Sequence, residues 1–138
     1  MNPIERPAIE GTEILLIEDC PGDIELFKVM FQHEYPSYHL TVATDGIVAL
    51  GQFFDESNVY RPNAIVLDSD LPKLNSSEVL AAIKADERTK TIPVFFKGSE
   101  YDTKKWKGPK PDHYGGRMID VNSYFDFVRK IDSILNRR

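Results

Sequence analysis

Two stretches of the sequence decide its fold, Ile14-Leu15-Leu16-Ile17-Glu18-Asp19 and Ala64-Ile65-Val66-Leu67-Asp68-Ser69-Asp70. In each stretch a short run of apolar residues ends on acidic side chains. A wholly apolar run of this length indicates a strand that is buried on both faces, as in a parallel sheet. Ligands of open α/β sheets bind beyond the carboxyl ends of such strands. We therefore expect both acidic clusters at one edge of one sheet.

The acidic residues at these strand ends are Glu18, Asp19, Asp68 and Asp70. Carboxylates that share a small volume repel one another and raise one another's pKa values unless a cation compensates their charge. Carboxylate oxygens are suited to Mg²⁺, which keeps several waters and usually shares its coordination sphere with a phosphate. The sequence therefore predicts a site for magnesium and a phosphoryl group on a small α/β domain.

The composition restricts the class of protein. The chain has 138 residues, of which 41% are hydrophobic and 28% charged, and this predicts a single domain over residues 1–138 with a loose N-terminal segment over residues 1–12. No apolar run approaches the roughly 20 residues that span a bilayer, so we expect no membrane insertion. The single cysteine, Cys20, excludes an internal disulfide and favours a cytoplasmic setting. The net charge of −5 argues against nucleic-acid binding.

Hydrophobic periodicity predicts strands that alternate with helices. The expected strands span residues 13–17, 39–43, 64–67 and 92–96, and the expected helices lie between them and over residues 121–136. Ser76 and Ser77 are the expected N-caps of the helix over residues 78–85. This alternation implies a doubly wound sheet with right-handed crossovers.

The alternation stops after Phe96. Residues 97–116 contain four glycines, two prolines and five lysines, a composition that disfavours a full helix. We expect a loop there, with at most one helical turn around residues 101–106. We interpret the five lysines as side chains of a solvated loop.

At these residues the chain resembles the receiver domains of two-component response regulators. It is most similar to receivers that open with a Glu-Asp-x-Pro-Gly-Asp loop, some of which partner phytochrome-like or hybrid histidine kinases. The most specific stretches are Ile14 to Asp23, Asp45-Gly46-x-x-Ala49-Leu50, Leu67-Asp68-x-x-Leu71-Pro72-Lys73 and Glu78-Val79-Leu80. The resemblance implies a flavodoxin-like (CheY-like) sheet of five parallel strands in the order 2-1-3-4-5, here with a degraded fourth helix.

The resemblance assigns a role to each acidic residue at the strand ends. Asp68 takes the position of the phosphoacceptor, with Ser69 as its neighbour in the site. Glu18 and Asp19 take the positions of the acidic pair that holds Mg²⁺ with Asp68. The backbone carbonyl of Asp70 takes the position of a further metal ligand.

The chain departs from the family where a receiver contacts the phosphoryl group. Gly98 stands at the position of the family's Thr or Ser, and Ser99 beside it is the nearest hydroxyl. Arg117 stands in place of the family's Lys, either as a charge partner of the phosphoryl group or in a surface salt bridge with Glu18 or a neighbouring acid. Tyr114 fills the position of the aromatic switch residue.

Three classes of function follow from these observations. The first is a single-domain response regulator, not an enzyme, that receives a phosphoryl group on Asp68 from a sensor or hybrid histidine kinase or a phosphotransfer protein. It would signal by protein contact, with a homodimer as one possible assembly. The second is a degenerate receiver that acts as an adaptor without phosphorylation, favoured by Gly98 and Arg117.

The third class is enzymatic. The Asp68-x-Asp70 pair is similar to the start of haloacid-dehalogenase-type phosphatases, and together with Glu18 it is similar to the Toprim metal site of nucleases and primases. Turnover of a phosphate ester, or nicking of DNA, would support this class.

Overall fold

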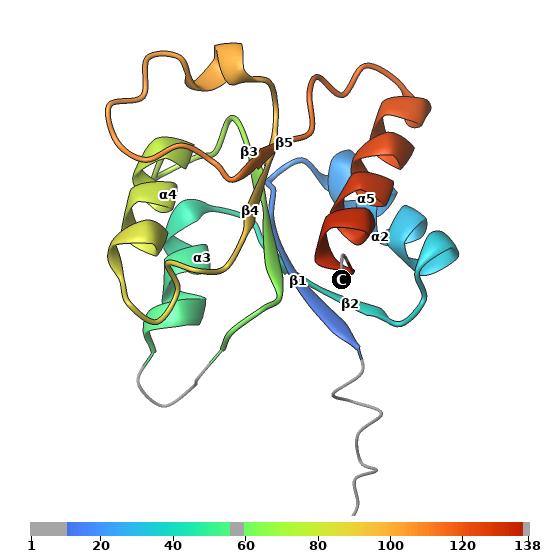
Figure 1. The fold of residues 1–138 in the computed structure, drawn as a ribbon, viewed down its shortest axis with the longest axis horizontal. Helices are drawn as coiled ribbons and strands as arrows, with labels where there is room; N and C mark the ends of the chain where they lie inside the picture. The colour runs from blue at the N-terminus through green and yellow to red at the C-terminus, as the bar shows by residue number, and fades with distance from the viewer. Residues whose placement is uncertain (1–10, 56–59, 137–138) are drawn as a thin grey trace, which may run out of the picture.

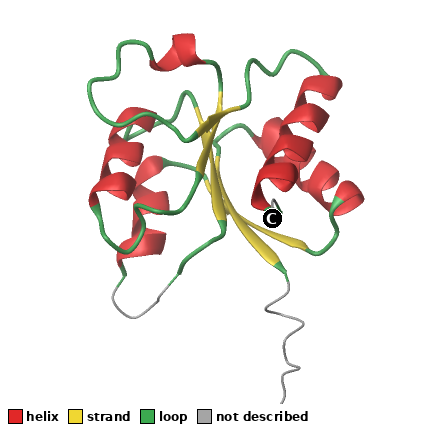
Figure 2. Cartoon of the chain, in the orientation of Figure 1, coloured by secondary structure: helices red, strands yellow, loops and turns green. Residues whose placement is uncertain are grey.

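A computed structural model describes residues 11–55 and 60–136, and these form one parallel sheet with helices on both faces (Figures 1 and 2). The strand order is β2-β1-β3-β4-β5, and every neighbouring pair is parallel. The strands are β1 (Thr12–Ile17), β2 (Tyr38–Ala43), β3 (Ala64–Asp68), β4 (Val94–Lys97) and β5 (His113–Tyr114). The expected sheet order 2-1-3-4-5 is confirmed.

The helices cover the two faces of the sheet in pairs. Their bounds are α2 (Pro21–Glu34), α3 (Gly46–Phe54), α4 (Ser76–Ala85) and α5 (Val121–Leu135). Figure 1 shows α3 and α4 on one face and α2 and α5 on the other. Within residues 11–55 and 60–136, no helix combines the length and the apolar character that crossing a membrane requires.

The hydrophobic core lies in two layers because the central strands are buried on both faces. Alternate side chains of a strand point to opposite faces. Leu15, Ile17 and Leu67 therefore belong to the layer under α3 and α4, and Leu16 and Val66 to the layer under α2 and α5. All of these side chains are at most 1% exposed. This is the burial expected of a continuous apolar run in a parallel sheet.

The N-cap of α4 is a different residue from those expected from the sequence. Asn75, and not Ser76 or Ser77, is the N-cap of α4: its side chain accepts from the backbone N–H of Glu78, and the Glu78 carboxylate accepts from the backbone N–H of Asn75. This reciprocal arrangement is a capping box. Ser76 is thereby left inside the first turn, where its buried hydroxyl has a different partner, described below.

The segment after β4 has no full helix, as its glycines and prolines predict. It contains one short 3₁₀ helix, η1 (Glu100–Thr103), and it returns through the two residues of β5. Several expected boundaries differ by one or two residues, and at two places a residue changes its assignment. Thr12, assigned to the loose N-terminal segment, begins β1, and Lys97, assigned to the loop, ends β4. The rest of the N-terminal prediction, residues 1–10, lies outside the described residues.

Two glycines of α3 provide a matched test of this packing. A Cβ at Gly46 would lie 2.6 Å from Val79 Cγ2 and 2.7 Å from the carbonyl oxygen of Leu74, whereas a Cβ at Gly51 would meet nothing within 4 Å. We expect Gly46→Ala to lower the free energy of unfolding by about 1–3 kcal/mol through overpacking against α4. Gly51→Ala should raise it by about 0.5–1 kcal/mol, because alanine favours a helix interior. Urea unfolding measures both changes, and equal effects of the two substitutions would contradict this packing of α3 against α4.

Candidate functional site

The site lies at the carboxyl ends of β1, β3 and β4, where parallel register places three charged residues in one row. Ile17 pairs with Leu67, and Glu18 and Asp68 follow these two residues; Asp68 itself pairs with Lys97. Residues in register on parallel strands point to the same face of the sheet. Asp68 and Lys97 therefore share the face of Val66 and Phe95, which is covered by α2 and α5.

Three of the predicted acidic residues come together in this row. One carboxylate oxygen from each of Glu18, Asp19 and Asp68 lies within 4.8 Å of the other two. Glu18 is 1% exposed and Asp68 is 7% exposed, whereas Asp19 is on the surface. Carboxylate oxygens so grouped fit the ligand preference of Mg²⁺. Asp70 is exposed beyond the end of β3.

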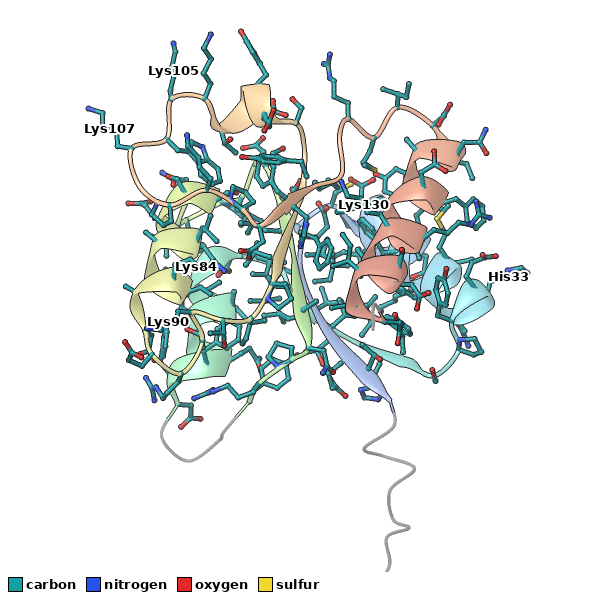
Figure 3. All side chains as sticks on the ribbon, in the orientation of Figure 1. His33, Lys84, Lys90, Lys105, Lys107 and Lys130 are labelled. Atoms are coloured by element: carbon teal, nitrogen blue, oxygen red, sulfur yellow. The ribbon has the colours of Figure 1, made fainter. Side chains whose placement is uncertain are left out.

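Lys97 contacts this acidic cluster directly, which the sequence-based interpretation of a solvated lysine missed. Its Nζ lies 2.6 Å from Glu18 Oε1, 2.8 Å from Asp23 Oδ2 and 3.3 Å from Asp68 Oδ1. The Lys97 side chain is 10% exposed. Lys105 and Lys107, in contrast, extend away from the sheet into solvent (Figure 3). The interpretation was therefore wrong for Lys97.

A signal for Lys97 was present in the sequence. Lys97 follows the apolar run of Val94, Phe95 and Phe96, just as Asp68 follows the apolar run of β3. The rule that places functional side chains at the carboxyl ends of parallel strands applies to both residues. Grouping Lys97 with the lysines of the following loop concealed this equivalence.

Burial and pairing set the protonation of Glu18 and Lys97. Burial raises the pKa of Glu18 to about 7, against the opposing hydrogen bond from Lys97. Burial alone would lower the pKa of Lys97, but its hydrogen bonds to Asp23 and Glu18 outweigh that effect and raise the pKa above its usual value. Lys97 is therefore an ammonium ion at neutral pH, and it compensates the negative charge of the cluster.

Backbone and hydroxyl contacts fix the position of Asp68. The hydroxyl of Ser76 donates to the carbonyl oxygen of Asp68 at 2.5 Å, and the backbone N–H of Ser69 donates to Asp68 Oδ1 at 2.8 Å. On β1, the backbone N–H of Cys20 donates to Glu18 Oε2 at 3.2 Å. These contacts hold the two buried carboxylates in place at the sheet edge.

Gly98, and not a residue with a hydroxyl group, follows the end of β4. A Cβ at Gly98 would lie 2.6 Å from the Phe96 ring and 2.9 Å from Asp102 Oδ2, so the position has no room for a larger side chain unless these neighbours move. Ser99 Oγ donates to Asp102 Oδ2 at 3.2 Å, within the capping box that begins η1. The Ser99 hydroxyl is thus engaged in the local turn.

Arg117 and Tyr114, the remaining two predicted site residues, have different surroundings. Arg117 is exposed and lines a pocket together with Asp68, Lys97 and Gly98. The structure gives Arg117 no hydrogen bond or ion pair with a described residue, and its role stays a prediction. Tyr114 packs edge-on against Phe96, and its hydroxyl is 2.8 Å from Thr103 Oγ1.

Comparisons with known proteins show what the chain is similar to. No protein-family model matches the chain. Its sequence is 38% identical over 85 residues to the response regulator Rcp1 of Synechocystis sp., an alignment that covers 59% of this chain and 57% of Rcp1. The structure of the phosphorylated cyanobacterial phytochrome response regulator RcpA is 26% identical and covers 92% of this chain and 95% of its own, with a TM-score of 0.75. In sequence and in fold, the chain is similar to response regulator receiver domains.

A second solved structure is similar over the whole receiver domain. The Mn²⁺-bound form of Rcp1 is 28% identical, with a TM-score of 0.73, and covers 92% of this chain and 96% of its own. Receivers of this kind with bound metal are therefore among the structural neighbours. In the present structure the carboxylates of Glu18, Asp19 and Asp68 lie together as a group that could hold a metal ion.

Removal of the Lys97 ammonium should destabilise the receiver domain in a pH-dependent way. Lys97→Met leaves Glu18 and Asp68 buried without their cation, and breaking a buried ion pair costs about 3 kcal/mol or more. Because the folded-state pKa of Glu18 is raised, its protonation at low pH relieves the Glu18 part of this loss, so the deficit should be smaller near pH 5 and grow as the pH rises through about 7.

Urea unfolding in EDTA, at a series of pH values, measures the deficit against wild type. Lys105→Met is the matched control, since it removes an exposed lysine of the loop after β4. A deficit that is equal at all pH values, or one shared by Lys105→Met, would contradict the described ion pairs.

Proposed function

We propose that this receiver domain accepts a phosphoryl group on Asp68 from a histidine kinase or a phosphotransfer protein, in the cytoplasm, and passes the signal on by protein contact. The observation that carries the proposal is the cluster of Glu18, Asp19 and Asp68 at the carboxyl ends of β1 and β3. The similarity to RcpA, whose structure is of a phosphorylated form, supports the same role for Asp68.

The proposed chemistry uses the Asp68 carboxylate as a nucleophile. Asp68 Oδ1 accepts from the backbone N–H of Ser69, so we assign the attack to Oδ2. An O–P bond forms at Oδ2 as the N–P bond of the donor phosphohistidine breaks, and the electron pair of that bond stays on the imidazole nitrogen. The result is an acyl phosphate on Asp68 and a histidine that takes up a proton from solvent.

The residues present fit a bound divalent cation. Glu18, Asp19 and Asp68 would hold it, with the backbone carbonyl of Asp70. When bound, Mg²⁺ supplies positive charge that offsets the charge on the phosphoryl oxygens. The chain's own contribution is to hold Asp68 still through the hydroxyl of Ser76 and the backbone N–H of Ser69.

One observation favours a second candidate function, a receiver that acts as an adaptor without phosphorylation. Gly98 provides no hydroxyl at the end of β4, and the Ser99 hydroxyl is bound to Asp102. Since a switch requires a local charge event to bias a two-state element, loss of the hydroxyl would weaken the coupling between Asp68 and the segment after β4. Phosphoryl uptake itself separates the two candidates.

Incubation with Mg²⁺ and acetyl phosphate tests the leading candidate. Intact mass spectrometry should show one added phosphoryl group on the wild-type chain, because the Asp68 carboxylate can displace acetate from the small donor. Asp68→Asn should show none, since an amide is a far weaker nucleophile.

Asp126→Asn, an exposed substitution on α5, is the matched control and should label like wild type. No added mass on the wild-type chain would favour the adaptor. Equal labelling of Asp68→Asn and wild type would remove Asp68 as the acceptor.

A further inference from the structure

Lys97 occupies the place where a metal ion would compete for ligands. Its ammonium is bound to Glu18 Oε1 at 2.6 Å and to Asp68 Oδ1 at 3.3 Å, and both residues belong to the acidic cluster. Mg²⁺ binds carboxylate oxygens at about 2.0–2.1 Å, so an ion on the same two carboxylates would lie within a few ångströms of the ammonium. Two cations at that separation in a buried site repel strongly.

The structure also shows where the ammonium could remain when the metal binds. Lys97 Nζ lies 2.8 Å from Asp23 Oδ2, at the start of α2. Asp23 is outside the group of Glu18, Asp19 and Asp68 that could hold a metal ion. Lys97 can therefore keep its contact with Asp23 while it releases the other two carboxylates.

The neighbour of Lys97 on the β5 side is a glycine, so the cation that pairs with Glu18 and Asp68 comes from β4. Phe96 pairs with Tyr114, so Gly115, the residue that follows β5, is beside Lys97. Gly115 has no side chain to place in the row, and a Cβ there would lie 2.6 Å from the Phe127 ring. Among the described residues, Lys97 is the one cation with a recorded ion pair to Glu18 or Asp68.

We propose that Lys97 is a tethered competitor of the divalent metal: it neutralises Glu18 and Asp68 in the metal-free protein and must leave them before the ion binds. This inference rests on the proposed function, because it takes the cluster of Glu18, Asp19 and Asp68 as the metal site. Lys97 thereby sets the metal affinity of the receiver domain, and with it the concentration of Mg²⁺ at which Asp68 becomes reactive.

The test is a direct measurement of Mg²⁺ and Mn²⁺ affinity by titration calorimetry on the full chain. We expect Lys97→Met to lower the Kd by about ten- to a hundredfold, the range over which residues next to metal ligands change affinity. Lys97→Arg, which keeps the charge, and Lys105→Met, which removes an exposed charge, should bind the metal as wild type does. Lys97→Gln, which retains hydrogen-bonding capacity, replaces Lys97→Met if the latter does not fold.

The outcomes separate this inference from the proposed function. Equal or weaker metal binding by the uncharged variants, with wild-type phosphoryl uptake on Asp68 intact, would overturn the role of Lys97 alone. If neither wild type nor the variants bind either metal, both the competition and the metal-dependent part of the proposed function are wrong.

A second measurement uses the wild-type chain, so it does not depend on how the variants fold. The side-chain ammonium resonance of Lys97, assigned by its absence in Lys97→Arg, should shift as Mg²⁺ binds. A resonance that stays unchanged while calorimetry reports metal binding would overturn the proposal.

Discussion

The site depends on the register of three parallel strands. Glu18, Asp68 and Lys97 are neighbours only because β1, β3 and β4 pair so that Asp68 and Lys97 end their strands in the same row and Glu18 directly follows β1. A shift of one residue would turn each side chain to the other face of the sheet. The apolar runs before these residues prevent such a shift, because both faces of the sheet are buried. The hydrophobic core thus fixes the geometry of the charged row.

The source of the cation in the row differs from the receiver pattern that the sequence resembles. In that pattern the cation is the lysine in whose place Arg117 stands. Here β5 has two residues and is followed by Gly115 and Gly116, and Lys97 of β4 lies between the carboxylates instead. The ammonium allows Glu18 and Asp68 to be buried together, since two unpaired buried carboxylates would be costly. The same contact places the Lys97 ammonium where a divalent ion would bind. Lys97 therefore stabilises the folded protein and, by the same contact, lowers its affinity for the metal.

Much of this could be predicted from the sequence, and the errors have physical causes. The apolar runs of β1 and β3 predicted the sheet, and the acids after them predicted the cluster of Glu18, Asp19 and Asp68, because strand ends meet at one edge. The N-cap of α4 was placed one or two residues late, since Asn75 and Ser76 are both good caps and only the tertiary contact of Ser76 with Asp68 decides between them. Lys97 was missed because composition alone does not show where a strand ends and a lysine-rich loop begins. Its partners lie 74 and 79 residues away in the chain, so no local pattern predicts the contacts.

The most direct test is a pair of high-resolution crystal structures, one of the metal-free protein in EDTA and one after soaking in Mn²⁺. We predict that Lys97 Nζ contacts Glu18, Asp23 and Asp68 in the first structure. In the second, Mn²⁺ should lie among Glu18, Asp19 and Asp68, with Lys97 retained by Asp23 alone. A metal-free structure in which Lys97 extends into solvent would contradict the central claim, as would Mn²⁺ bound while Lys97 keeps all three contacts.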